Sequence, residues 1–193
     1  IEQKESYKWL ASAERSQRYF QAGGAKMVTH IGDRESDLYE EWATVPDKYN
    51  HVLVRVRQDR RLFDQVQSLY RYLSQQPCEG TYTINVQADN RLQRTAREAL
   101  LTVRFFFFMI KRPQALNQFD YPPALNLYAV EVEEVSPPIG QEPIHWRLMT
   151  THDVMSIEQA LQVVEWYQWR WRIEQLFATL KKAGLNLEAT QLE

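Results

Sequence analysis

The sequence lacks the features that several enzyme classes require. It contains one cysteine, Cys78, which excludes an intrachain disulfide and fits a reducing cytoplasm. Only 6 residues are glycine, and neither a P-loop nor a dinucleotide fingerprint is present. The four histidines, which are His30, His51, His145 and His152, show no paired spacing for zinc. Nucleotide, redox and zinc chemistry therefore have no support in the sequence.

Long apolar runs are also absent. The longest, Phe105 to Ile110, is far shorter than the ~20 residues of a membrane helix, and Arg104 and Lys111 flank it. Hydrophobic residues nevertheless make up 44% of the 193 residues and aromatics 12%. These fractions predict a folded core, and the length suits one large domain or one domain with an insertion. The short apolar runs predict no membrane partner.

Charge is unevenly distributed along the chain, although the net charge is only −2. Residues 51–112 hold 11 Lys and Arg against 5 Asp and Glu, whereas residues 113–156 hold 1 against 6. A basic segment inside a mildly acidic chain fits a partial nucleic-acid footprint. An arginine-rich solvent face explains the charge equally well.

The strongest pattern is a long helix predicted to begin near Ser156. Ser156 and Gln159 have the spacing of a capping box. Apolar residues then recur at helical spacing, namely Ile157, Ala160, Leu161, Val164 and Tyr167.

Polar residues continue along one side of this helix. At ~100° per residue they fall within a sector of roughly 60°, and they are Tyr167, Arg170, Glu174 and Lys181. Arginine and lysine bind phosphate, and glutamate binds hard divalent cations. A solvated charged stripe is the simpler explanation. It is opposed by the tryptophans that crowd the same turns, Trp166, Trp169 and Trp171, because they are costly on a plain solvent face.

Before this helix, two types of pattern follow one another. Helix, strand, helix and strand are predicted over 4–20, 25–32, 36–45 and 51–57, an order that implies parallel pairing in an α/β sheet. A helix is then predicted over 62–73 and strands over 81–87, 100–110, 125–135 and 144–150. Short loops between these strands indicate an antiparallel β insertion. Glu131 and Glu133 are expected to point outward from theirs.

A carboxylate, Asp33, stands at the carboxyl end of the strand predicted over 25–32. Open α/β sheets place their ligand crevice at such ends. Asp37 is explained more simply by helix N-capping. Asp33 and Glu174, meeting from distant parts of the chain, would supply carboxylates of the kind that a two-metal phosphoryl-transfer site requires.

The pattern Tyr-x2-Arg-x3-Glu-x6-Lys resembles the YREK motif of DDE transposases of the insertion-sequence-four family, Tn-five type. Similar segments include the opening KESxKWL, the Asp33-Arg34-Glu35-x-Asp37 stretch and the Pro137-Pro138 turn. The resemblance covers nearly the whole chain and is weakest between residues 58 and 125.

This resemblance implies an α/β, ribonuclease-H-like catalytic core with a β-rich insertion before the final catalytic helix. The boundaries would be residues 1–57 for the first part of the core, 58–155 for the insertion and 156–193 for the final helix. Members cut transposon-end DNA through a hairpin and join it to target DNA, using two Mg²⁺ or Mn²⁺ ions. A homodimeric synaptic complex in the bacterial cytoplasm, associated with the nucleoid, is expected.

The resemblance also implies roles for individual residues. Asp33 matches the second triad aspartate and Glu174 the triad glutamate, and both would bind metal. Residues that match DNA-binding positions are Tyr167, Arg170, Lys181, Trp146, Arg55, Lys8 and Trp171. Among them Trp146 matches a tryptophan on which a flipped base stacks.

One departure from the family pattern lies at the front of the chain. The family's first three strands and first triad aspartate have no counterpart before Lys4. A fragment of the catalytic core that does not cleave DNA alone is therefore expected. A regulatory DNA-binding remnant and a ribonuclease-H-like nuclease unrelated to transposition are the alternatives.

Overall fold

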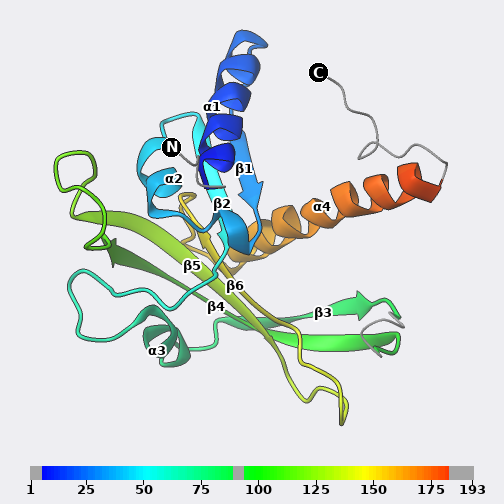
Figure 1. Ribbon diagram of the computed structural model, residues 1–193. Coiled ribbons are helices and arrows are strands. Elements are labelled where there is room, and N and C mark those ends of the chain that lie inside the picture. Colours follow the sequence, from blue (N-terminus) through cyan, green and yellow to red (C-terminus); the bar gives the residue numbers. More distant parts are fainter. Residues whose placement is uncertain (1–5, 89–93, 183–193) are drawn as a thin grey trace.

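The computed structural model of the chain describes residues 6–88 and 94–182 (Figure 1). The first half contains α1 (Ser6–Ala22), β1 (Val28–Gly32), the short 3-10 helix η1 (Arg34–Ser36), α2 (Tyr39–Thr44), β2 (Asn50–Arg55) and α3 (Leu69–Ser74). The second half contains β3 (Gly80–Val86), β4 (Arg97–Lys111), β5 (Ala124–Glu134), β6 (His145–Thr150) and α4 (Ile157–Lys182).

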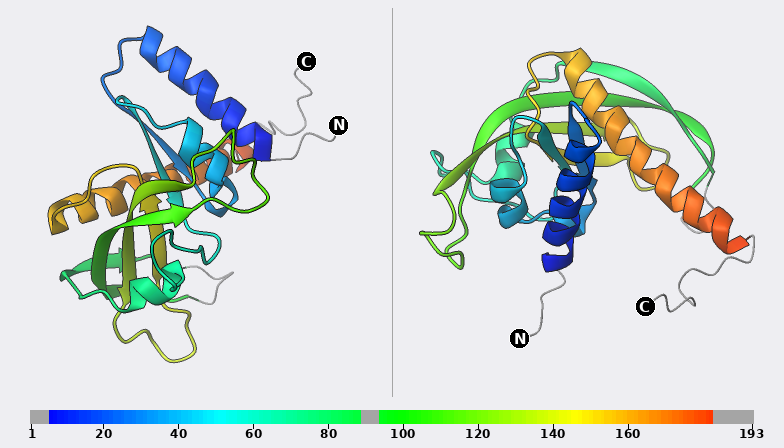
Figure 2. Two further views of the ribbon diagram at one scale, coloured as in Figure 1. Left: turned by 90° about the vertical axis from the view of Figure 1, so that its left-hand side faces the viewer. Right: turned by 90° about the horizontal axis from the view of Figure 1, so that it is seen from above.

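The strands form one six-stranded sheet in the order β1-β2-β6-β5-β4-β3. Only β1 and β2 run parallel, as the early helix–strand pattern predicts, and every other neighbouring pair is antiparallel. The long β4 and β5 are strongly curved (Figure 2). Because β6 pairs with β2 on one side and β5 on the other, the parallel and antiparallel parts form one continuous sheet.

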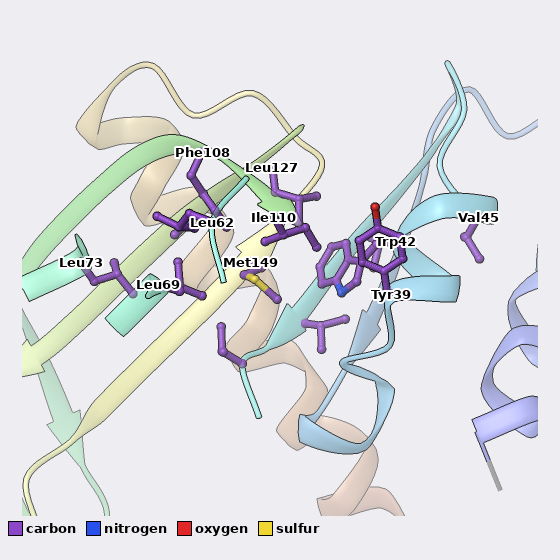
Figure 3. Close-up of a cluster of buried hydrophobic side chains, with 14 of the residues drawn as sticks. Tyr39, Trp42, Val45, Leu62, Leu69, Leu73, Phe108, Ile110, Leu127 and Met149 are labelled. Carbon is purple, nitrogen blue, oxygen red and sulfur yellow. The ribbon is translucent and has the colours of Figure 1, made fainter. Parts of the chain in front are cut away.

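One face of the sheet is covered by α1, α2 and α3. Side chains of alternate strand residues, such as Val54, Ile110 and Met149, form a core there with Trp42 of α2 and Leu69 of α3 (Figure 3). Fully burying one such side chain contributes about 1.5–3 kcal/mol. This core fixes the loop between β1 and α2 against the sheet.

The other face is covered by α4. Its first turns bury Ala160, Val163, Val164 and Tyr167 against Leu53 of β2 and residues of β4, β5 and β6. The predicted capping box forms in part: the Gln159 amide donates to Ser156 Oγ at 3.4 Å, whereas Gln159 Oε1 accepts at 2.7 Å from the amide of Met155, one residue before the cap. Farther on, α4 extends beyond β1 and β2 (Figure 1).

The helix predicted over 62–73 is wrong in its first half. Only Leu69–Ser74 is helical. Leu62 instead forms an antiparallel bridge with Ile110, and the Phe63 amide donates to the Met109 carbonyl at 2.9 Å. Leu62 is almost completely buried beside β4. The extended conformation is more stable here than the helix that the periodicity predicts, because it gains both this burial and a ladder hydrogen bond.

The outward orientation predicted for Glu131 is also wrong. Its side chain is buried and accepts hydrogen bonds from His145 Nε2 and Arg147 Nε, both at 2.8 Å. Arg104 lies 3.7 Å away on the neighbouring strand. Burial raises the pKa of Glu131, but the two hydrogen bonds and the charges of Arg147 and His145 together outweigh it, so the pKa is lowered overall. A charged residue is tolerated at this inward position because its partners are strand neighbours.

Glu41 of α2 generates a test of the fold by pH. Burial, together with the charge of Asp37, raises the pKa of Glu41 to about 7, from 4.5. The folded chain thus binds this proton more tightly, so the stability that it contributes is present below pH ~4.5 and is lost as the pH rises through about 7. We expect Glu41→Gln to stabilise the protein by about 2 kcal/mol more at pH 8 than at pH 5, measured by denaturant unfolding.

Glu40→Gln, on the same helix at a less buried position, is the matched control. A stability difference between Glu41→Gln and wild type that does not change with pH would contradict the assigned protonation.

Candidate functional site

The site begins where the parallel strands end. In the register of β1 and β2, Gly32 pairs with Val54, so Asp33 and Arg55 emerge at the same edge of the sheet. Arg170 of α4 reaches this edge, with its Nη1 3.7 Å from Asp33 Oδ2. The strand-end carboxylate and the final helix, which the sequence predicts to converge, therefore lie together.

The Asp33 carboxylate is held by a backbone amide at one oxygen and faces Arg170 with the other. Oδ1 accepts from the Glu35 amide at 2.9 Å and caps η1. Oδ2 faces Arg170, and the side chain is 36% exposed. A carboxylate oriented by a backbone amide yet accessible to solvent suits a ligand for a cation.

Gly32, which has no side chain, allows Ser36 to approach the end of β1 closely. A Cβ at Gly32 would lie 1.7 Å from Ser36 Oγ and 2.8 Å from Ser36 Cβ. Ser36 is fully buried, and its hydroxyl donates to the Asp33 carbonyl at 3.1 Å. The placement of Asp33 thus depends on close approach of Ser36 to the backbone of Gly32.

Asp37 is not the helix cap that the sequence predicts. Leu38 is the N-cap residue of α2, without a side-chain hydrogen bond. Asp37 is buried and instead binds Arg60, whose Nε and Nη2 lie 3.1 and 2.5 Å from Oδ1. Its Oδ2 accepts from the Arg57 amide at 2.8 Å. The buried Arg60 requires a counter-charge, so this pairing outweighs capping and anchors residues 57–60 to the strand-end loop.

Three further predicted residues gather beside Arg170. Arg55 Nη2 donates to the His145 carbonyl at 3.2 Å. The rings of Trp146 and Tyr167 are 6.0 Å apart in an edge-to-face arrangement, and Arg170 Cζ lies 5.9 Å from the Tyr167 ring. Burial lowers the pKa of Arg55, and the nearby charge of Arg34 adds to this effect. Concentrated positive charge at a desolvated site attracts an anion.

The remaining predicted residues are less informative. Lys8 is exposed on α1, a helix that contacts β1 and η1. Glu174 lies in α4 four residues, or one helical turn, after Arg170. The side chains of Glu174, Trp171 and Lys181 fall outside the part of the chain that the structure describes.

A groove of about 1690 Å³ adjoins this cluster. Its lining includes five arginines, which are Arg34, Arg55, Arg57, Arg94 and Arg147. Tyr70 and Trp146 add aromatic surface, and Glu142 is the only acidic residue among the described residues that line it. Arginines combined with aromatic rings in one groove are typical of a surface that binds a nucleic-acid backbone and stacks bases.

Sequence reasoning missed Arg147, which lies in the acidic segment 113–156. Glu131 holds its Nε, and its guanidinium carbon stacks 4.2 Å from the centre of the Tyr70 ring. For Arg57 and Arg94, the excess of basic residues over 51–112 was the available signal. Arg34 was noticed only as a neighbour of Asp33.

The residues fit part of a divalent-cation site. Asp33 supplies a hard oxygen ligand, and α4 brings the backbone of Glu174 within one turn of Arg170. Within residues 6–88 and 94–182, no cluster of three acidic, histidine or cysteine side chains has the geometry to hold a metal ion. In the same ranges, none of the helices is both long and apolar enough to cross a bilayer.

The site thus combines a carboxylate at a strand end, an arginine on the crossing helix and a basic groove. Residues 11–193 match the family described as the transposase DDE domain, so the chain belongs to that family. The mixed α/β fold and its mostly antiparallel six-stranded sheet are compatible with the ribonuclease-H-like domain of DDE transposases. Membership implies an enzyme of the nuclease or transposase type that binds DNA ends.

The contact at Gly32 can be tested by mutation. We expect Gly32→Ala to destabilise the protein by about 2 kcal/mol or more, because its methyl group overlaps Ser36. The clash involves both Oγ and Cβ of Ser36, so adding Ser36→Ala should recover only part of the loss and adding Ser36→Gly more of it. Denaturant unfolding of the single and double variants measures this coupling. Purely additive effects would show that Ser36 is not the obstacle.

Proposed function

We propose that the chain is the catalytic-core part of a cut-and-paste DNA transposase of the insertion-sequence-four family with a YREK motif. The observation that carries the proposal is the 3.7 Å approach of Arg170 to Asp33. Arg170 belongs to the YREK pattern and Asp33 matches a triad aspartate. Their contact joins the two motifs, which are far apart in the sequence, at one edge of the sheet.

In this proposal the arginines orient the DNA backbone. Arg170 and Arg55 bind phosphate oxygens near the cleaved end, and their guanidinium groups present paired donors that match phosphate geometry. Tyr167 is almost completely buried, so it mainly packs α4 against the sheet beside Trp146. Trp146 is half-buried and lines the groove, which suits a stacking surface for a flipped base. Lys8, Trp171 and Lys181 contribute further DNA contacts.

Asp33 and Glu174 are the proposed metal ligands, for two Mg²⁺ or Mn²⁺ ions in a complete site. Bound metal would activate the attacking oxygen and stabilise the leaving one. The chain's own contribution is to hold Asp33 with one oxygen fixed by the Glu35 amide. Arg170, beside that carboxylate, keeps the phosphate close to it.

The proposal extends to the architecture and to the partners. Residues 1–57 and 156–193 form the ribonuclease-H-like core, and residues 58–155 form the β-rich insertion. Transposon-end and target DNA are the substrates, processed through a hairpin by a homodimeric synaptic complex in the nucleoid.

Arg170→Ala tests the phosphate role. We expect weaker binding of transposon-end DNA and a salt dependence whose log–log slope falls by about 0.9, the value for one phosphate contact. Fluorescence anisotropy at several salt concentrations measures both. Arg172→Ala is the control, because Arg172 is exposed on the same helix and lies 5.7 Å from the Trp169 ring. Equal effects of the two variants would show that Arg170 contributes only general positive charge and makes no specific phosphate contact.

Cleavage gives a second test. The resemblance identifies two triad carboxylates in this chain, Asp33 and Glu174, and a third is needed for full metal affinity. We therefore expect no nicking of transposon-end DNA by the chain alone with Mg²⁺, assayed on labelled duplex. Nicking that Glu174→Gln abolishes would contradict this expectation. Cleavage without preference for transposon ends would favour a nuclease.

A further inference from the structure

A second basic pocket lies outside the groove. It has a volume of about 290 Å³ and is formed by residues 58–61 and 111–114. Four of the lining residues are cationic, namely Arg60, Arg61, Lys111 and Arg112, and Asp59 is the acidic one. Neither Arg61 nor Lys111 takes part in the proposed chemistry.

Hydrogen bonds hold the two basic segments together despite their like charges. The Lys111 amide donates to the Arg61 carbonyl at 3.0 Å. The next residues continue the pairing through the bridge between Leu62 and Ile110. The backbone thus fixes Arg61 and Lys111 side by side, and the resulting repulsion favours a bound anion.

The charged groups of the pocket differ in their availability. Arg60 is bound to Asp37, and Arg112 donates to the backbone carbonyls of Tyr121 and Gln118. The carboxylate of Asp59 accepts from the Tyr70 amide at 2.9 Å. Arg61 and Lys111 are exposed, and neither forms an ion pair with any residue in the described ranges.

The pocket adjoins the groove along the chain. Arg57 lines the groove and Gln58 lines the pocket. From Arg57 to Arg61 the backbone spans at most about 14 Å. That length corresponds to about four base pairs of duplex at roughly 3.4 Å each. Arg61 therefore lies within about four base pairs' length of Arg57 in the groove lining, a distance that one duplex can span.

We propose that this pocket binds a backbone phosphate of the same DNA, outside the groove. The inference rests on the proposed function, since it assigns the path of that substrate. Arg61 and Lys111 line the pocket but are exposed and not enclosed. Such an open arrangement suits a phosphate within a polymer better than a small free anion. Such a contact positions the duplex and does not read its sequence.

The test compares the 193-residue chain with its variant Arg61→Gln/Lys111→Gln. Loss of the two cations that bind this one phosphate should lower the log–log salt slope of binding by about 0.9. The loss should be present with long duplexes and absent with duplexes too short to leave the groove. The control Arg18→Gln/Lys26→Gln removes the same charge from exposed positions in and after α1. Thermal melting verifies that all variants fold.

The outcomes separate this inference from the proposed function. An unchanged slope in Arg61→Gln/Lys111→Gln, with the wild type still binding DNA through Arg170, overturns the pocket assignment alone. Absence of DNA binding by the wild type overturns both. Inorganic phosphate is a separate probe: ³¹P line broadening that needs Arg61, without any change in the DNA slope, assigns the pocket to free phosphate and overturns the DNA contact.

Discussion

The packing of α4 on the sheet determines where Arg170 lies relative to Asp33. Ala160, Val163, Val164 and Tyr167 bury one stripe of the helix against β2, β4, β5 and β6. With that stripe fixed, the next turn carries Arg170 to the carboxyl ends of β1 and β2. The apolar contacts are nondirectional, but the helical repeat converts them into a defined position for a charged group one turn later. The site therefore depends on a core that contains none of its proposed catalytic groups.

Buried carboxylates organise the basic surface. Asp37 holds Arg60, Glu131 holds Arg147, and Glu134 binds Arg97 at 2.8 Å. Each carboxylate is almost completely shielded from solvent, whereas Arg147 reaches the groove. The net charge of −2 therefore conceals a strongly basic groove, because part of the negative charge lies beneath it. The acidic and basic segments of the sequence meet side by side as β5 and β4.

Local patterns predicted much of the fold. Period-two alternation identified β3 and period-3.6 spacing with a capping box identified α4, because both signals arise from neighbours in sequence. Asp33 was found because it directly follows a buried strand. Glu131 and Asp37 were placed wrongly because their buried partners, Arg147 and Arg60, come from other segments. Residues 62–68 were predicted to be helical because the sequence does not reveal that Leu62 pairs with Ile110, a residue far away in the chain. Long-range pairing of charges leaves no periodic trace, so the arginine groove was visible only as an excess of positive charge.

The central position of β6 has a consequence for how the molecule acquires its structure. Leu53 of β2 pairs with Thr150 of β6, so the closing of this ladder must wait until the whole intervening chain is available. Such distant pairing slows folding, since the entropy of a long loop is lost before any contact compensates for it. On a ribosome, β2 emerges before β6, so the two can pair only after β6 has been synthesised. The contact between Asp33 and Arg170 likewise joins an early and a late segment, so this edge is complete only once α4 has packed on the sheet.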